Sequence, residues 1–207
     1  MSQNLIFYTN PMSRGRIVRW MLEEIGQPYE TVILDYATSM KAAPFLAINP
    51  MGKVPALVHN GYVITECAAI CTYLADMFPL AGLAPEPLDP LRAAYLRWMF
   101  FCAGPVEAAL SVAGLGVIVP DAKRGMVGWG NMESVIEQLD TLAQNAAPNI
   151  LGDRFTALDV YLGSQIGFGL QFGTMPKLPS FESYMANIMS RPAAIKAREI
   201  DDALLSV

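Results

Sequence analysis

Three short segments of the chain carry residue types and spacings that suit the binding of a small anionic ligand. The first is Tyr8–Arg16, where an apolar strand pattern gives way to a helical pattern. Such a turn directs backbone N–H groups and the positive end of a helix dipole at one spot, which favours an anion. A hydroxyl there, from Ser13 or Tyr8, can donate to a thiolate, although a serine in this place is commonly just a helix N-cap.

The second segment is Asn49–Leu57, in which Pro55 opens a strand. A proline removes one backbone donor from a strand, so its place there needs a reason. A cis Val54–Pro55 bond would turn the N–H and C=O of Val54 outward, where an extended peptide can pair with them as an added strand. Only about 5–6% of X–Pro bonds are cis, so the dipeptide alone does not establish this geometry.

The third segment is Thr65-Glu66-Cys67, at the start of a predicted helix. Backbone N–H groups at a helix N-terminus suit a ligand carboxylate, and Glu66 can hold an ammonium beside it. A carboxylate and an ammonium on one carbon describe the head group of an amino acid. The structural alternative is an N-cap at Thr65 followed by an acid that complements the helix dipole.

The scarce residue types exclude several chemistries. The cysteines are Cys67, Cys71 and Cys102, an odd number without CxxC spacing, which indicates neither a disulfide framework nor a zinc site and suits a reducing cytosol. The single histidine, His59, excludes a site built from several histidines, so we expect no metal. It precedes Asn60-Gly61, a strong hairpin signal, and we interpret it as a strand residue beside a turn.

Charge and hydropathy exclude two further classes of protein. The 207 residues carry a net charge of −5, and a nucleic-acid binder needs a basic face instead. The first four residues have no basic region, so we expect no signal peptide. The run from Trp98 to Val119 is long enough for a bilayer and contains only Glu107 as a charge. Because Gly104-Pro105 interrupts it, we expect a buried helix that breaks or bends near Pro105, followed by an apolar loop, and no membrane span.

The elements that must position these segments follow from periodicity. In the first 79 residues, the order is βαβ, then a weaker helix, then ββα. The strands are predicted at Leu5–Thr9, Tyr29–Leu34, Val54–His59 and Tyr62–Ile64, and the helices at Ser13–Gly26, Ser39–Ile48 and Thr65–Phe78.

A Pro-rich stretch separates this part from the rest of the chain. Residues 80–90 cannot continue a helix, and we predict a linker there. Residues 91–207 lack strand alternation and are predicted to form an all-α domain, with helices at Leu91–Cys102, Gly130–Ala146, Thr156–Phe172 and Phe181–Ser190. Thr156 and Asp159 have capping-box spacing, which we interpret as a folding signal.

Together, the strings NPMGKVPAL and TEC in the first part and ILGDRFTALDVYLG in the second resemble the glutathione S-transferase superfamily. The resemblance covers nearly the whole chain and implies an α/β thioredoxin-like domain followed by an all-helical domain. It also implies that glutathione is bound by a cis-proline loop at Val54-Pro55, by Lys53 at the glycyl carboxylate, and by Glu66-Cys67. The superfamily usually has serine where this chain has Cys67, so a hydroxyl is lost there while the backbone N–H remains.

The same resemblance places thiol activation at the turn spanning Met12, Ser13 and Arg14. Ser13 is the only hydroxyl of the three, so we predict a serine-type turn with Ser13 as the catalytic residue and Tyr8 as its rival. No cysteine lies in this turn, which disfavours subtypes that form a mixed disulfide. Cys67 and Cys71 are four apart on one helix, and we expect them to be packed and not reactive.

The function implied is that of a cytoplasmic transferase, active in detoxification, that joins the glutathione thiol to an apolar electrophilic small molecule. Glutathione would act as co-substrate, and the protein would form a homodimer. We expect the electrophile to contact the first helix of the all-α domain at Tyr95, Trp98, Phe101 and Cys102, although three- and four-residue spacing also describes an ordinary core. The alternative is a non-catalytic module that binds glutathione, another ligand or a protein on the same fold.

Overall fold

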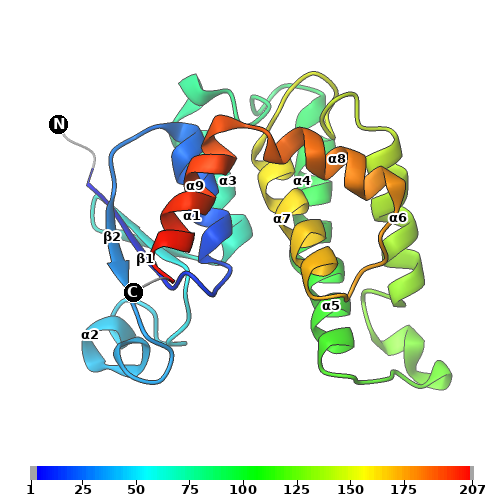
Figure 1. Cartoon of the computed structure of the whole chain (residues 1–207), viewed down its shortest axis with the longest axis horizontal. Helices are drawn as coiled ribbons and strands as arrows, with labels where there is room; N and C mark the ends of the chain where they lie inside the picture. Colours follow the sequence, from blue (N-terminus) through cyan, green and yellow to red (C-terminus); the bar gives the residue numbers. More distant parts are fainter. Residues whose placement is uncertain (1–3, 206–207) are drawn as a thin grey trace. The chain divides into compact units, whose positions relative to one another are not determined.

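The computed structural model describes residues 4–205 and divides the chain into two compact units (Figure 1). Residues up to Ala81, joined by those from Arg191 onward, form the first unit, and Gly82–Ser190 form the second. The division falls within the Pro-rich stretch. The prediction about a signal peptide concerns residues 1–4, most of which lie outside the described range.

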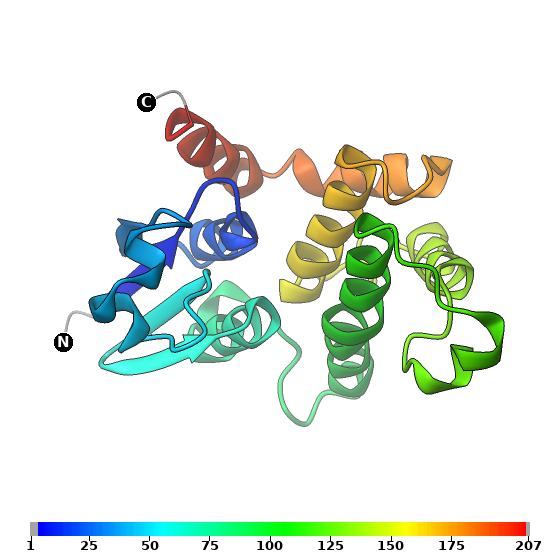
Figure 2. The same cartoon turned by 90° about the horizontal axis from the view of Figure 1, so that it is seen from below.

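A four-stranded mixed sheet forms the centre of the first unit, and the predicted strands are confirmed. The strands are β1 (Leu5–Thr9), β2 (Glu30–Ile33), β3 (Ala56–His59) and β4 (Tyr62–Thr65), in the spatial order β2-β1-β3-β4. β1 is parallel to β2, whereas β3 is antiparallel to both β1 and β4. Asn60 and Gly61 both have positive φ, as the predicted two-residue hairpin requires, and Figure 2 shows this hairpin in cyan.

Helices cover both faces of the sheet, as the thioredoxin-like prediction requires. α1 (Gly15–Ile25) and α3 (Cys67–Met77) pack together on one face, over the buried side chains of Leu5 and Phe7. On the other face, α2 (Ala43–Leu46) and a 3₁₀ turn at Ser39–Lys41 contribute to a cluster of buried residues, Leu34, Met40, Phe45 and Ala56. The predicted helix at Ser39–Ile48 is therefore in two pieces, because Pro44 has no N–H and its ring excludes the carbonyl four residues earlier.

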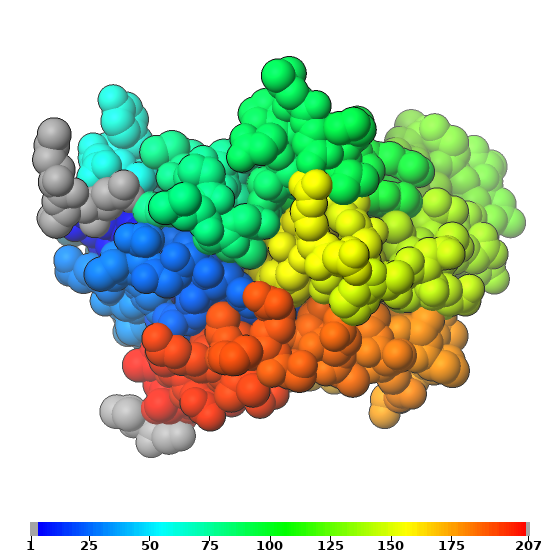
Figure 3. Space-filling view, turned by 90° about the horizontal axis from the view of Figure 1, so that it is seen from above, coloured from blue at the N-terminus to red at the C-terminus, as the bar shows by residue number. Residues whose placement is uncertain are grey.

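The last helix, α9 (Pro192–Ala203), packs against α1 and so falls with the first unit (Figure 3, red against blue). No helix is predicted there from the sequence, and the prediction that all residues after 90 form one helical domain is wrong for this segment. Two features hold α9 in place. Its buried residues Ala194 and Ala197 are small and allow close approach, and charged residues of α1 and α9 form ion pairs.

The second unit is helical, as predicted. Its helices are α4 (Leu91–Phe101), α5 (Glu107–Gly114), α6 (Met132–Gln144), α7 (Ala157–Gln171) and α8 (Pro179–Met189), with a 3₁₀ turn at Asp121–Met126. α7 is the most deeply buried, and it begins with the predicted capping box of Thr156 and Asp159. Asp159 also accepts a hydrogen bond from the Tyr184 hydroxyl of α8 at 2.9 Å, which ties these two helices together.

The apolar run after Trp98 differs from its prediction at one point. A π-helical segment, Cys102–Val106, joins α4 to α5 through Pro105, so a helix continues to Gly114 in the place of the predicted apolar loop. A π turn shifts the hydrogen-bond register by one residue, which accommodates the missing N–H of proline within a continuous helix. Between residues 4 and 205, none of the helices combines the length and the apolar character needed to cross a membrane.

Candidate functional site

The strand register brings the three predicted segments to one edge of the sheet. Ala56, which follows Pro55, pairs with Tyr8 on one side and with Thr65 on the other. The end of β1, the start of β3 and the end of β4 are thus neighbours. The turn after β1, the proline loop before β3 and the start of α3 consequently lie together.

A contact between the first and third segments supports this placement. The Cys67 thiol donates to the carbonyl oxygen of Arg14, with 3.7 Å between sulfur and oxygen. Cys67 is buried at the first position of α3, and Arg14 directly precedes α1. The N-termini of α1 and α3 are therefore adjacent, and both dipoles contribute positive potential at the same edge.

Asn10 organises the turn between β1 and α1, a role that the sequence analysis missed. Its side-chain amide donates to the carbonyl of Leu34 at 2.8 Å, which fixes the turn to the chain after β2. Its side-chain oxygen accepts from the backbone N–H of Met12 at 2.9 Å. Asparagine forms such Asx turns readily. Its place directly after a predicted strand was therefore the signal in the sequence from which this role of Asn10 could have been predicted.

Ser13 lies within this turn and is half-buried. Its hydroxyl donates to the carbonyl of Asn10 at 2.6 Å and accepts from the N–H of Gly15 at 2.9 Å. The predicted N-cap is displaced by one residue, because α1 begins at Gly15 and Arg14 occupies the cap position, where its side chain does not cap the helix. To donate to a ligand, the Ser13 hydroxyl has to turn away from Asn10.

Gly15 allows α1 to begin directly against β1. A Cβ at this position would lie 1.9 Å from Oγ1 of Thr9 and 2.9 Å from Oγ of Ser13. Thr9 is fully buried. A side chain at position 15 would thus push the helix N-terminus away from the end of the strand.

Tyr8, the rival to Ser13, points to the other face of the sheet. Its ring packs against Phe45 with 5.6 Å between centroids, beside the cluster that α2 contributes to. The side chain is half-buried. The structure therefore places Tyr8 among packing residues of that face and Ser13 in the turn that begins α1.

The proline loop is built around the buried side chain of Asn49. The amide of Asn49 donates to the carbonyl of Lys53 at 2.7 Å, and its oxygen accepts from the N–H of Met51 at 3.1 Å. Gly52 has a φ of 58°, and its carbonyl accepts from Nζ of Lys41 at 2.7 Å. The loop is thus held by Asn49 on one side and by Lys41 on the other. The Asn-Pro dipeptide that begins the loop is a sequence signal for a turn.

The predicted cis geometry of Val54–Pro55 is confirmed. Val54 is half-buried, Pro55 is buried and the Lys53 side chain is exposed. Within the described residues, no hydrogen bond joins the backbone of Val54 to another part of the chain. Its N–H and C=O groups are accordingly open to an extended ligand.

Glu66 stands out by its backbone conformation. Its φ is 67° and its ψ is 122°, a region that residues with a Cβ rarely adopt. The helix begins at Cys67, two residues later than predicted, because Thr65 still pairs with Ala56 in the sheet. Residues with strained backbone conformations are found more often at functional sites than elsewhere. Here the strained residue is Glu66, whose carboxylate is exposed beside the start of α3.

The four residues predicted to contact the electrophile separate into two groups. Tyr95 and Cys102 have no exposed surface within the described chain and belong to the core of the helical unit. Trp98 and Phe101 are half-buried, with their rings in a T-shaped contact at 5.3 Å, and the Arg97 guanidinium lies 4.1 Å from the Trp98 ring centroid. Within this unit, only Trp98 and Phe101 of the four present apolar surface.

The remaining cysteines and the histidine have structural environments. Burial raises the pKa of the Cys71 thiol and that of the Cys102 thiol, so both stay protonated and unreactive. His59 is buried, and its Nδ1 lies 2.8 Å from the Tyr73 hydroxyl. This agrees with the interpretation of His59 as a strand residue beside the hairpin.

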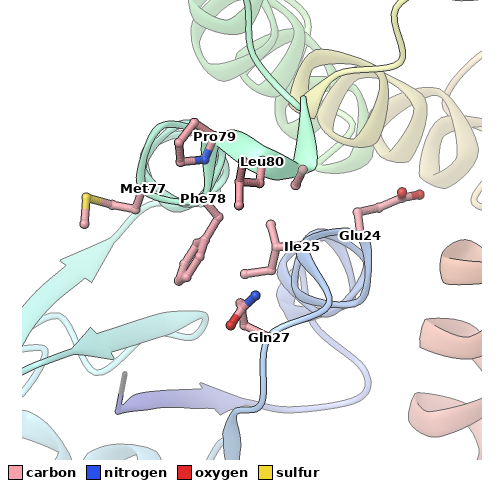
Figure 4. A pocket seen from close by; sticks show the side chains of 8 residues that line it. Glu24, Ile25, Gln27, Met77, Phe78, Pro79 and Leu80 are labelled. Carbon is pink, nitrogen blue, oxygen red and sulfur yellow. The ribbon is translucent and has the colours of Figure 1, made fainter. Parts of the chain in front are cut away.

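The first unit also has a pocket of about 450 Å³ at the opposite ends of α1 and α3 (Figure 4). Its lining is mainly apolar, with Ile25, Phe78 and Leu80 from the C-terminal ends of these helices and the chain that follows. None of the residues from the three segments lines it. We therefore place the candidate site at the N-terminal ends of the two helices, where the motifs meet.

Comparison of the chain with known families identifies the same superfamily that its motifs resemble. Residues 3–76 match the family model of the glutathione S-transferase N-terminal domain. The chain is 31% identical over 166 residues to glutathione S-transferase 3 of Zea mays, covering 75% of this chain and 73% of that protein. It is 41% identical over 88 residues, 39% of this chain, to LigF of Sphingobium sp.. The chain spans only 34% of LigF, and 46% of glutathione S-transferase GST-4.5 of Xanthomonas campestris.

Solved structures extend the similarity over both units. A glutathione transferase from Methylococcus capsulatus superimposes with a TM-score of 0.80 at 26% identity, covering 96% of this chain and 99% of that one. A sphingomonad glutathione S-transferase complexed with glutathione gives 0.76 at 28% identity, covering 95% and 98%.

Proposed function

This chain belongs to the glutathione S-transferase superfamily, and on that premise we propose that it joins the thiolate of glutathione to an apolar electrophilic small molecule. The observation that carries the proposal is the meeting of three segments at one sheet edge, where Ala56 pairs with both Tyr8 and Thr65. This edge combines an open peptide backbone, two helix N-termini and an exposed carboxylate. These groups match the chemistry of a tripeptide that carries a thiol.

Glutathione would lie across this edge in an extended conformation. The Val54 backbone would pair with the cysteinyl part as an added strand. At one end, Glu66 would accept hydrogen bonds from the γ-glutamyl ammonium, and first-turn N–H groups of α3 would bind the adjacent carboxylate. At the other end, the exposed ammonium of Lys53 would meet the glycyl carboxylate. Cys67 would contribute its main chain only, because its thiol faces the Arg14 carbonyl.

Activation of the thiol would take place at the turn before α1. The thiolate is the nucleophile, and each unit by which the thiol pKa falls corresponds to about 1.4 kcal/mol of preferential stabilisation. A Ser13 hydroxyl turned from Asn10 towards the sulfur, the N-terminus of α1 and the charge of Arg14 would each favour the anion. The thiol proton leaves to solvent in this scheme.

With an aryl halide as electrophile, the reaction is a substitution. The sulfur lone pair forms the new S–C bond, and the halide departs with the electrons of the bond that breaks. The exposed parts of Trp98 and Phe101 on α4 are the apolar surface that we assign to the electrophile. Tyr95 and Cys102 would support these residues from the core of the helical unit.

A non-catalytic binding module is the second candidate, and two observations favour it. Cys67 stands where the superfamily usually has serine, and the Ser13 hydroxyl is engaged by backbone groups on both sides. Such a protein would retain glutathione without lowering the pKa of its thiol.

Two measurements separate these candidates. Retention on immobilised glutathione tests binding, and turnover of an activated aryl halide in the presence of free glutathione tests catalysis. We expect both results to be positive. Retention without turnover would support the binding module, and failure of retention would contradict both proposals.

We further propose a cytoplasmic homodimer. Cys67, Cys71 and Cys102 form no disulfide within the described residues, which suits a reducing compartment. The edge strand β4 exposes the apolar side chains of Tyr62 and Val63, a surface that a second copy can cover. Analytical ultracentrifugation should give twice the chain mass, and a monomer at micromolar concentration would contradict the dimer.

A further inference from the structure

α9 reaches the turn that carries Ser13 through two ion-pairing side chains. Arg16, on the first turn of α1, donates from Nε to the carbonyl of Pro11 at 2.6 Å. Nη2 of the same guanidinium pairs with Oδ1 of Asp202 at 2.8 Å. Asp202 lies near the end of α9, so the chain's last helix is connected to the turn before its first helix.

Asn10 attaches one side of the turn to the chain after β2, and Arg16 attaches the turn at Pro11. Pro11 has no N–H, so its carbonyl is the only backbone group through which it can be held by a hydrogen bond. Farther along the turn, the Tyr36 hydroxyl donates to the carbonyl of Met12 at 3.0 Å. The Arg16 bond therefore fixes the side of the turn that faces α1 and α9.

Arg16 can hold the Pro11 carbonyl in place only if its guanidinium also has a second partner. A long side chain loses rotamer freedom when it is held in one geometry, and a single bond to a carbonyl compensates only part of that loss. Asp202 holds the other end of the guanidinium. Its own position is fixed because the neighbouring Asp201 forms a buried ion pair with Arg19 on the same face of α1.

We propose that Asp202 is a positioning residue for thiol activation, acting through Arg16 on the turn that presents Ser13; this rests on the proposed function. Asp202 touches neither the thiol nor its acceptor. Its effect is to keep the Arg16 guanidinium against the Pro11 carbonyl, so that the turn holds Ser13 and the N-terminus of α1 in the positions from which they would favour the thiolate. The C-terminal helix is thereby part of the machinery that sets the thiol pKa.

The negative charge of Asp202 has an opposite electrostatic effect, and two variants separate it from positioning. Asp202→Ala removes both the contact with the Arg16 guanidinium and the negative charge. Asp202→Asn removes the charge but keeps an oxygen that accepts from Arg16. Positioning predicts a raised thiol pKa in the alanine variant only, whereas charge alone predicts a lowered pKa in both.

The test is a titration of the thiolate absorbance of glutathione bound to the full-length chain. We expect Asp202→Ala to raise the bound thiol pKa by about 0.5 unit, which lowers the thiolate fraction about threefold below the pKa. Glutathione affinity should change less than about twofold, and the melting temperature should stay unchanged, because the pair is partly exposed. Asp121→Ala is the matched control, since it removes the carboxylate of an exposed Arg–Asp pair in the other unit.

Arg16→Ala should give the same rise, and the double variant with Asp202→Ala should rise no further. A bound thiol pKa in Asp202→Ala equal to that of the wild type would overturn the proposal, as would an equal fall in both Asp202 variants. A parallel loss of melting temperature and affinity would assign Asp202 a structural role and overturn it too. If the wild type binds glutathione without lowering the thiol pKa, the proposed transferase fails, and the positioning role fails with it.

Discussion

Arg19 and Asp201 lie 182 positions apart, and their side chains meet in a buried ion pair with 2.7 Å between Nε and Oδ1. The Arg19 guanidinium also contacts the hydroxyls of Tyr29 and Thr31, so it links α1, β2 and α9. Burial raises the pKa of the Asp201 carboxyl, although Arg19 opposes the shift. Within the described residues, Nη2 of Arg19 and Oδ2 of Asp201 have no hydrogen-bond partner. The pair thus specifies where α9 docks without being fully satisfied.

Removing one member of this pair should be far more harmful than replacing both. Asp201→Ala leaves the Arg19 charge buried and should lower the free energy of unfolding by about 3–5 kcal/mol. The double variant Arg19→Met/Asp201→Leu should recover most of that loss, because apolar side chains need no partner. Urea denaturation measures both, and a double variant less stable than Asp201→Ala would contradict this account.

Gly15→Ala should destabilise the start of α1. The added Cβ would lie 1.9 Å from Oγ1 of the buried Thr9, and overpacking of this kind costs about 1–3 kcal/mol. Gly114→Ala in α5 is the matched control, because no atom lies within 4 Å of its added Cβ. Thermal unfolding should show a loss only at position 15, which Thr9→Ala should partly reverse in the double variant. Equal melting temperatures for the two single variants would show that β1 and α1 can separate freely.

Glu66 should contribute more to glutathione binding than Cys67 does. Glu66→Gln removes a charge-assisted hydrogen bond to the ligand ammonium and should weaken binding by about 1.5–3 kcal/mol. Cys67→Ser restores a hydroxyl donor and should leave binding unchanged or tighten it. Isothermal titration calorimetry measures both, and tighter binding by Glu66→Gln, or a clear loss with Cys67→Ser, would reverse the assignment.

Glu66→Gly separates backbone strain from ligand binding. Glycine adopts positive φ without steric cost, so this variant should be more stable by about 1 kcal/mol and yet bind glutathione more weakly. Denaturant titration and calorimetry on the same sample measure the two effects. A loss of stability would show that the Glu66 side chain serves the fold.

Ser13, and not Tyr8, should set the pKa of the bound glutathione thiol. The Ser13 hydroxyl lies at the N-terminus of α1, whereas the Tyr8 ring packs against Phe45. Thiolate absorbance against pH should show a raised thiol pKa in Ser13→Ala and none in Tyr8→Phe. A rise in Tyr8→Phe alone would transfer the role to Tyr8, and no rise in either would assign it to backbone N–H groups or Arg14.

Tyr29 should make stability fall at alkaline pH. Burial, together with its hydrogen bond to the Glu23 carboxylate, raises the pKa of Tyr29 from 10.0 to about 12. The folded state therefore holds this proton more tightly than the unfolded state does. The stabilisation from Tyr29 is fully present below pH 10 and is lost as the pH rises towards 12.

Urea denaturation between pH 8 and about pH 12 tests this dependence. Tyr29→Phe should show a shallower loss of stability over the alkaline range than the wild type does. Tyr36→Phe is the control, because its side chain is exposed and lies outside the surface that we assign to the dimer. Identical alkaline slopes for the wild type and Tyr29→Phe would contradict the expectation.

Local patterns were sufficient to predict the first unit's sheet and most helices. The strands have alternating or β-branched runs, Asn60-Gly61 has one dominant turn geometry, and Thr156 and Asp159 form a cap within four residues. Each of these signals acts between residues close in sequence. The helix at Ser39–Ile48 was predicted wrongly where the effect of Pro44 outweighed a weak helical period.

The sequence by itself determined the family, the strand order, most of the helices, and the three segments that carry the candidate site, because those features depend on neighbours along the chain. Only the tertiary structure decided that Cys67 contacts Arg14 and that α9 joins α1 through Arg19 and Asp201. An ion pair between positions 182 residues apart leaves no periodic trace in either segment, since many acids and bases along the chain are equally suitable partners. The packing of the folded chain decides which acid meets which base, because a buried charge without an opposite partner lowers the free energy of unfolding.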